Sequence, residues 1–132
     1  MKNNYQCPFC KGFLNVGEHI TITARLKNGL SGMLLLHPEL GNYEIVHHPR
    51  FVIESGETVE FKCPICSKSL TSDKNEELAQ IIMTDDLGKE FEVYFSKIKG
   101  IKSTYQIIGD NVKIYGDDST KYIDFFNLSQ LT

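Results

Sequence analysis

The chain has 132 residues, a formal net charge of −3 at pH 7 and an ordinary globular composition, with 41% hydrophobic and 23% charged residues. Such a length fits one domain, or two small halves that share a core. The acidic balance argues against a protein that grips phosphate backbones, because such proteins normally carry a surplus of Lys and Arg. The longest uninterrupted apolar run, residues 33–36, is far too short to cross a bilayer.

The first feature along the chain is a cysteine pair, Cys7-Pro8-Phe9-Cys10. No apolar stretch precedes it, so we expect no signal peptide, and the cytoplasm is the expected location. In a reducing compartment, paired cysteines serve metal ions rather than disulfides.

Alternating hydrophobicity dominates the segment that follows. Residues 19–26 alternate between apolar and polar side chains, Asn28-Gly29 supplies a hairpin turn, and residues 30–37 form the expected partner strand. In this partner the apolar run at residues 33–36 indicates burial on both faces, and Gly32 marks an expected bulge. Shorter strands are predicted at residues 43–48, 51–53 and 58–62.

The second half is more polar, and residues 67–132 hold the entire net charge. We expect a hinge at residues 71–77 and a short helix at residues 73–80 with Ser72 or Asp73 as its N-cap. Further strands are predicted at residues 80–84, 90–98, 103–108 and 112–115, with a strand or short helix at 122–128. The sequence therefore predicts a mainly β, antiparallel protein with at most one or two short helices. Its expected parts are residues 1–72 and 73–132, with one shared core as the alternative.

A second cysteine pair, Cys63-Pro64-Ile65-Cys66, repeats the first, and the chain has no other cysteine. The repeat extends beyond the cysteines. Residues 5–14 and 61–70 have an aromatic residue, Cys, Pro, an apolar residue, Cys and Leu at the same offsets. Proline after the first cysteine presets φ for a tight turn, which leaves backbone N–H groups free to donate to the sulfurs. Gly12, two residues after the first pair, is expected to supply a positive φ. Four such thiolates predict a tetrahedral site for one Zn²⁺ per chain, with Cys7, Cys10, Cys63 and Cys66 as ligands.

These turns resemble the knuckles of zinc ribbons and rubredoxin-like domains, and the paired Cys-Pro-x-Cys units are similar to those of bacterial CpXC-type proteins. The resemblance covers about twenty residues and implies the same four cysteine ligands. The 52 residues from 11 to 62 exceed the length of a compact ribbon. We therefore expect ribbon-like knuckles with an inserted β-meander.

Three other uses of the cysteines remain open. Iron fits the same four-thiolate cage. A redox-sensitive zinc switch needs exposed thiolates. A thiol–disulfide enzyme normally has its C-x-x-C motif at the start of a helix in a βαβ setting, which this β-rich sequence does not suggest.

The remaining candidate residues favour structural roles. His47 and His48 are neighbours on a predicted strand and face opposite sides, which argues against a second metal site. The carboxylate pairs at residues 85–86 and 117–118 sit beside glycines and are typical of turns. Core packing is favoured over an aromatic binding face for the tyrosines of the second half, Tyr94, Tyr105, Tyr115 and Tyr122. No nucleophile elbow, phosphate loop or H-E-x-x-H segment occurs, so we expect no enzyme.

These observations favour a small zinc-binding protein that acts as a non-enzymatic interaction or adaptor module for a protein partner. The first alternative is a regulatory zinc ribbon associated with nucleic acid. Lys97, Lys99 and Lys102 are the only dense lysine cluster that would support it. The second alternative is a thiol-based redox sensor. Neither nucleic-acid binding nor membrane association is expected.

Overall fold

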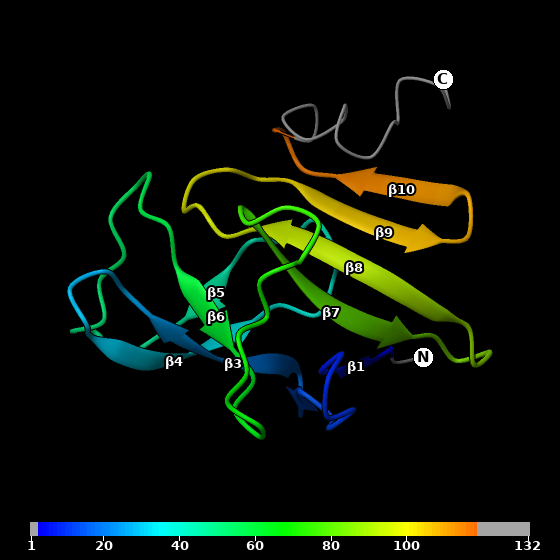
Figure 1. Ribbon diagram of the computed structural model, residues 1–132, viewed down its shortest axis with the longest axis horizontal. Coiled ribbons are helices and arrows are strands. Elements are labelled where there is room, and N and C mark those ends of the chain that lie inside the picture. The colour runs from blue at the N-terminus through cyan, green and yellow to red at the C-terminus, as the bar shows by residue number, and fades with distance from the viewer. Residues whose placement is uncertain (1–2, 119–132) are drawn as a thin grey trace.

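The computed structural model describes residues 3–118, and these residues form ten antiparallel strands and no helix (Figure 1). The prediction of a mainly β fold is confirmed. The strand or helix predicted at 122–128 lies outside the described residues. Within the described range, no helix is long and apolar enough to cross a membrane.

The strands make two five-stranded sheets. Sheet A has the order β1 (Asn4–Gln6), β7 (Leu78–Thr84), β8 (Glu90–Ser96), β9 (Thr104–Ile108) and β10 (Asn111–Tyr115). Sheet B has the order β2 (Asn15–Val16), β3 (His19–Arg25), β4 (Ser31–Leu36) and β5 (Ile45–Val46), and β6 (Glu60–Lys62) also pairs with β3. Figure 1 shows the two sheets as the right and left parts of the molecule.

The central hairpin of sheet B follows the sequence pattern on β3 but not on β4. Alternate residues of β3 are buried, as the period of two requires. The prediction that residues 33–36 are buried on both faces is wrong, because Met33 is 54% exposed while Leu34 is buried. The predicted bulge at Gly32 is also wrong, since Gly32 pairs in register with Ala24. The glycine instead makes room for a ring: a Cβ there would lie 2.8 Å from Phe51.

Local turn chemistry replaces the predicted helix at residues 73–80. The Ser72 hydroxyl accepts a hydrogen bond from the N–H of Lys74, and the Asn75 side chain accepts one from the N–H of Glu77. Such bonds offer the backbone an alternative to a helix. β7 then begins at Leu78, two residues earlier than the predicted strand.

Two segments predicted as strands are shorter or absent. Of residues 43–48, only Ile45–Val46 form a strand, and residues 51–53 form none. Phe51 and Ile53 are nevertheless buried, so the apolar pattern there reports packing rather than pairing.

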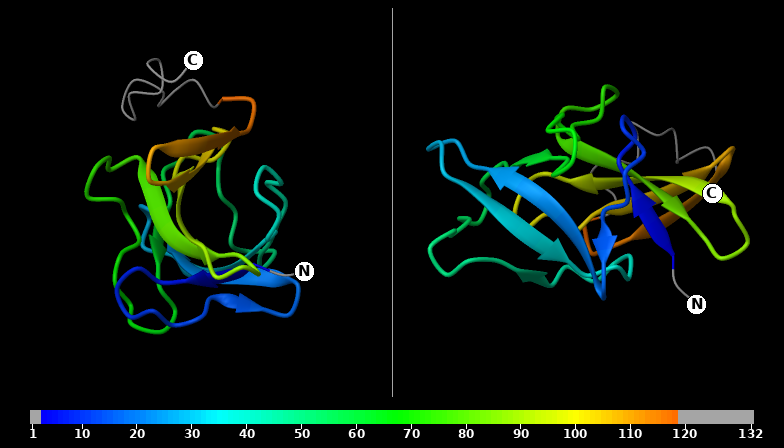
Figure 2. Two further views of the ribbon diagram at one scale, coloured as in Figure 1. Left: turned by 90° about the vertical axis from the view of Figure 1, so that its right-hand side faces the viewer. Right: turned by 90° about the horizontal axis from the view of Figure 1, so that it is seen from below.

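The two cysteine-bearing hairpins join the sheets. In the first, β1 pairs with β7 and β2 pairs with β3. The second runs in the opposite sense, because β6 pairs with β3 and Thr71 then bridges Ala79 on β7. We call this border, formed by residues 4–16 and 60–72 between β3 and β7, the seam. Figures 1 and 2 show the two hairpin turns, in blue and green, side by side.

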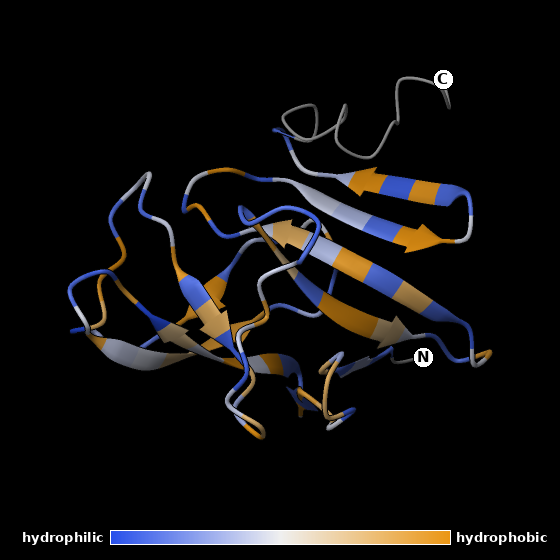
Figure 3. Ribbon diagram, in the orientation of Figure 1, coloured by the Kyte–Doolittle hydropathy of each residue, from blue (hydrophilic) through white to orange (hydrophobic). Residues whose placement is uncertain are grey.

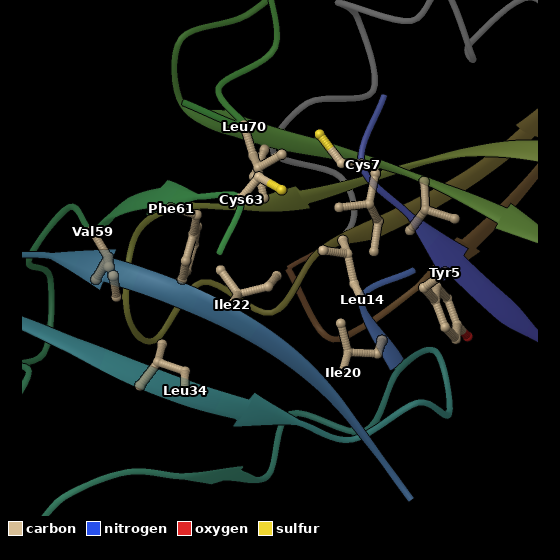
Figure 4. Packing of buried hydrophobic residues seen from close by; sticks show 14 of the residues in the cluster. Tyr5, Cys7, Leu14, Ile20, Ile22, Leu34, Val59, Phe61, Cys63 and Leu70 are labelled. Atoms are coloured by element: carbon tan, nitrogen blue, oxygen red, sulfur yellow. The ribbon is translucent and has the colours of Figure 1, made fainter. Parts of the chain in front are cut away.

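The core lies between the sheets. One cluster of buried side chains includes Ile22 and Leu34 from sheet B and Ile81 and Val93 from sheet A. Figure 4 shows part of this cluster, with Cys7 and Cys63 at the side of the seam. At the outer edge of sheet A, β10 alternates between hydrophilic and hydrophobic residues (Figure 3). The cluster draws on both predicted parts, 1–72 and 73–132, and their separate folding stays a prediction.

Candidate metal centre

The four cysteines meet at the middle of the seam. The Sγ atoms of Cys7 and Cys66 are 3.8 Å apart, and those of Cys10 and Cys63 are also 3.8 Å apart. All four sulfurs lie within 4.8 Å of one another. A regular tetrahedron with metal–sulfur bonds of ~2.3 Å has edges of about 3.8 Å between sulfurs. The predicted ligands therefore form a candidate metal site.

The two turns that present the cysteines have matched backbone bonds. The N–H of Lys11 donates to the carbonyl of Cys7 over 3.0 Å, and the N–H of Ser67 donates to the carbonyl of Cys63 over 2.9 Å. Both donors also have positive φ, 63° at Lys11 and 66° at Ser67. The repeat seen in the sequence is thus a repeat of turn geometry.

The expected role of Gly12 is wrong. The positive φ falls one residue earlier, at Lys11, and Gly12 is not in the left-handed region. A Cβ at Gly12 would lie 2.4 Å from Cδ1 of Ile65. Gly12 therefore leaves room for the Ile65 side chain of the second turn, which packs against the first.

Backbone N–H groups point at the sulfurs in both turns. The N–H of Phe9 donates to Sγ of Cys7 and that of Ile65 donates to Sγ of Cys63, both over 3.3 Å. The N–H of Gly12 donates to Sγ of Cys10 over 3.4 Å. Such bonds offset the negative charge of a four-thiolate cluster and fix the orientation of the ligands.

The four thiols differ in burial. Cys7 and Cys63 are buried, Cys66 is partly buried and Cys10 is exposed. Burial raises the pKa of the Cys7 thiol to about 12 and also raises the pKa of Cys63. The N–H of Lys68 lowers the pKa of Cys66. Two inner thiols of this kind need a cation to ionise readily, which suits a metal ion held at the border between core and solvent.

Apolar side chains project around the candidate site. The residues between proline and the second cysteine, Phe9 and Ile65, are 53% and 59% exposed, and Phe13 is 61% exposed. The ammonium of Lys68 lies 5.2 Å from the centre of the Phe9 ring. The outer surface of the seam is therefore apolar at its middle and carries basic groups beside it.

The other predicted candidates do not gather into a second site. His47 Nδ1 bonds to the carbonyl of His48, and His48 Nδ1 accepts from the N–H of Arg50. Within residues 3–118, the four cysteines are the only group of metal-ligating side chains close enough to share an ion. Asp85 has the predicted turn role, because its carboxylate accepts from the N–H groups of Leu87 and Lys89. Core packing is confirmed for two of the four tyrosines, Tyr94 and Tyr105, which are fully buried.

The lysine cluster does not form a free basic patch. Lys97 is only 6% exposed, and its ammonium contacts Glu60 at 3.3 Å and the Thr71 hydroxyl at 2.7 Å. The Ser69 hydroxyl also donates to Glu60. Burial alone would raise the pKa of the Glu60 carboxyl, but the bonds from Ser69 and Lys97 hold it below its usual range.

This polar network directly behind the second turn was missed by sequence reasoning. Glu60, Ser69 and Thr71 flank the cysteine pair on strands that oppose each other, and the bridge between Lys62 and Ser69 sets their register. The polar Glu60 beside the apolar Phe61 was a weak signal that the strand has a polar face opposite its buried one. The partner Lys97 comes from a distant segment, and no local pattern identifies it.

Comparison with protein-family models, curated proteins and solved structures finds no match to this chain.

Proposed function

We propose that this protein binds one structural Zn²⁺ through Cys7, Cys10, Cys63 and Cys66. The observation that carries the proposal is the pair of 3.8 Å sulfur–sulfur distances across the two turns. Four protein thiolates complete a tetrahedral shell and leave no open position for water or substrate, which is typical of structural rather than catalytic zinc. Iron fits the same geometry, and zinc is preferred because a closed tetrahedral site of four cysteines is typical of structural zinc.

We further propose that the outer surface of the seam is a docking site for another protein. Phe9, Phe13 and Ile65 are more than half exposed, and Ile65 packs against the first turn at Gly12. Exposed apolar side chains that gather together mark interaction sites. Lys11 and Lys68 are exposed on the same two turns. The partner that fits is a protein segment with apolar side chains bordered by carboxylates.

Paired variants test the docking proposal. Partners captured by the wild-type protein are compared with those captured by Phe9→Ser/Ile65→Ser and by Leu87→Ser. Leu87 is 77% exposed on the turn between β7 and β8, away from the cysteine turns, and serves as the control. The expected result is a partner that the double variant fails to capture and the control still captures. That partner, once purified, should bind the double variant at least 10-fold more weakly than it binds the wild-type protein. Equal binding by all three proteins would contradict the proposal.

Metal content is tested separately. Elemental analysis of protein expressed without added metal is expected to give about one zinc per chain. Absence of both zinc and iron, with the cysteines paired as disulfides, would contradict the metal proposal and leave the docking test to stand on its own.

Thiol-based redox sensing is the second candidate, and the exposure of Cys10 favours it. Two thiolates would give two electrons to a peroxide, which is reduced to water, and the disulfide formed would release the ion. Zinc release at a low excess of hydrogen peroxide, reversed by a thiol reductant, supports this role. Retention of zinc at a high excess of peroxide would contradict it.

A further inference from the structure

A cavity of about 440 Å³ opens between the two sheets, and none of the four cysteines lines it. Sheet B contributes Leu34, Leu36 and Ile45 to its walls, and sheet A contributes Val93, Phe95 and Thr104. The size falls within the range of small-molecule sites, which are mostly apolar clefts of about 300–1,000 Å³. The cavity therefore has the volume and wall chemistry of a ligand site.

The connection between β4 and β5 closes one side of this cavity. Its first part is held by Tyr5, whose hydroxyl donates to the carbonyl of Pro38. Its last part is held by Tyr43, whose hydroxyl lies 2.7 Å from that of Thr104 on β9. Because sheet A anchors this connection at two points, the cavity is a feature of the folded chain rather than a gap beside a free loop.

Several apolar side chains on the walls are only partly buried. Leu36, Leu40, Ile45 and Phe95 pack against the core cluster but keep part of their surface open. An apolar occupant would remove that surface from water, and each buried methylene contributes about 0.8 kcal/mol. The walls thus favour an alkyl chain over a polar ligand.

Lysines mark one wall of the cavity. Lys97, Lys99 and Lys102 all line it. Lys97 is neutralised by Glu60, but within residues 3–118 neither Lys99 nor Lys102 forms an ion pair. The ammonium of Lys99 donates to the carbonyl of Ile53 over 3.0 Å, and among the described residues this bond leaves two of its three N–H groups for another acceptor. The acidic residues that line the cavity, Glu39 and Glu44, come from the β4–β5 connection.

We propose that this cavity binds an aliphatic monocarboxylate, with the alkyl chain between the sheets and the carboxylate at Lys99 and Lys102. The apolar walls select the chain, and the ammonium groups of Lys99 and Lys102 select the charge. This site is separate from the metal centre and from the docking surface proposed above, and it does not depend on either.

Titration of the full-length, metal-loaded protein with fatty acids tests the proposal. Octanoate, decanoate and dodecanoate are compared by isothermal titration calorimetry, with 1-dodecanol as the neutral counterpart. The expected result is one site per chain, an affinity that rises about fourfold with each methylene, and binding of dodecanol about 10-fold weaker than that of dodecanoate. No saturable binding of any of the four compounds would overturn the proposal.

Variants locate the site. Ile45→Trp fills the cavity and is expected to weaken dodecanoate binding more than 10-fold. Val46→Trp is the matched control, because Val46 is the next residue of β5, is 54% exposed and does not line the cavity. Unchanged affinity in Ile45→Trp, checked for folding by circular dichroism, would overturn the proposed location.

A charge variant tests the role of the lysines, and it leaves the apolar core unchanged. Lys99→Gln is expected to weaken dodecanoate binding about 10-fold and to leave dodecanol binding unchanged. Lys89→Gln, at the exposed turn before β8, is the control. Equal loss for the acid and the alcohol, or no loss for the acid, would overturn the assignment of the carboxylate.

Discussion

The two sheets meet along two borders that are built in opposite ways. At the seam, both cysteine-bearing hairpins pair with β3 and with β7, and four thiols converge between them. On the other side, the cavity separates β4–β5 from β8–β9, Tyr43 reaches across to Thr104, and backbone hydrogen bonds join residues 56–59 to residues 97–99. The four thiols are therefore gathered at one border, and the cavity lies at the other.

Among the predicted changes, removal of one cysteine ligand is expected to cause the largest loss of stability. Cys63→Ser should abolish tight zinc binding and lose several kcal/mol of stability, since the binding free energy of such sites is on the order of 10 kcal/mol and is coupled to folding. Ser67→Gly is the control, because it keeps the positive φ of the turn. Chemical denaturation and metal analysis of the two variants measure the effect.

Amide exchange after chelation sharpens the same prediction. Protection should fall first in β1 and β6, which are joined to the rest of the molecule at the seam, and should persist longer in β9 and β10 at the far edge of sheet A. Equal loss of protection in all four strands would contradict a role of the metal that is specific to this border.

Removal of the buried Lys97 ammonium, behind the second turn, should cause the next largest loss of stability. Lys97→Met leaves Glu60 without its charged partner and removes a bond to Thr71. Truncating one member of a fully buried pair costs about 3–5 kcal/mol. The Glu60 side chain is 37% exposed, and solvent screening reduces the expected loss to about 1–3 kcal/mol. The double variant Glu60→Leu/Lys97→Met should lose less than the two single changes together, as urea denaturation can measure; simple additivity would argue against the pair.

A comparison of two glycines tests packing at the seam against packing in sheet B. Gly32→Ala pushes a Cβ to 2.8 Å from the buried Phe51 ring, and an overpacked core of this kind costs about 1–3 kcal/mol. Gly12→Ala meets Cδ1 of Ile65, the mobile end of an exposed side chain, and should cost less than about 1 kcal/mol. Thermal unfolding of both variants gives the order, and the reverse order would show that the turns at the seam are the more tightly packed.

The smallest expected effect is a pH dependence from Glu60. Its pKa is lower in the folded protein than in the unfolded chain, so the ionised carboxylate contributes stability above its unfolded pKa. That contribution is lost as the pH falls through the folded pKa. The stability difference between the wild type and Glu60→Gln should therefore shrink below about pH 4, near the unfolded value for Glu. A difference that grows on acidification would contradict the assigned shift.

Patterns local in the sequence predicted the parts of this fold that depend on local chemistry. The alternation in β3, the Asn28-Gly29 turn and the repeat around the cysteines each reflect a few neighbouring residues. The same reasoning placed the four cysteines together, because two copies of one turn indicate a shared ion.

Features set by distant contacts could not be predicted in this way. Met33 is exposed and Gly32 is unbulged because of how β4 packs against β3 and Phe51. Residues 78–80, the last part of the predicted helix, belong to β7 because they pair with β8. Lys97 lies in a polar network with Glu60 only because the segment after β8 crosses behind the second turn.

X-ray absorption at the metal edge of the purified protein tests the central claim most directly, because it reports the ion and its ligands together. The account predicts a zinc edge and a single shell of four sulfurs at ~2.3 Å. In Cys10→Ser, one sulfur should be lost from that shell or the zinc should be absent. Nitrogen or oxygen ligands in the wild-type protein, or cysteines joined as disulfides with no bound metal, would contradict a zinc ion that joins the two sheets at the seam.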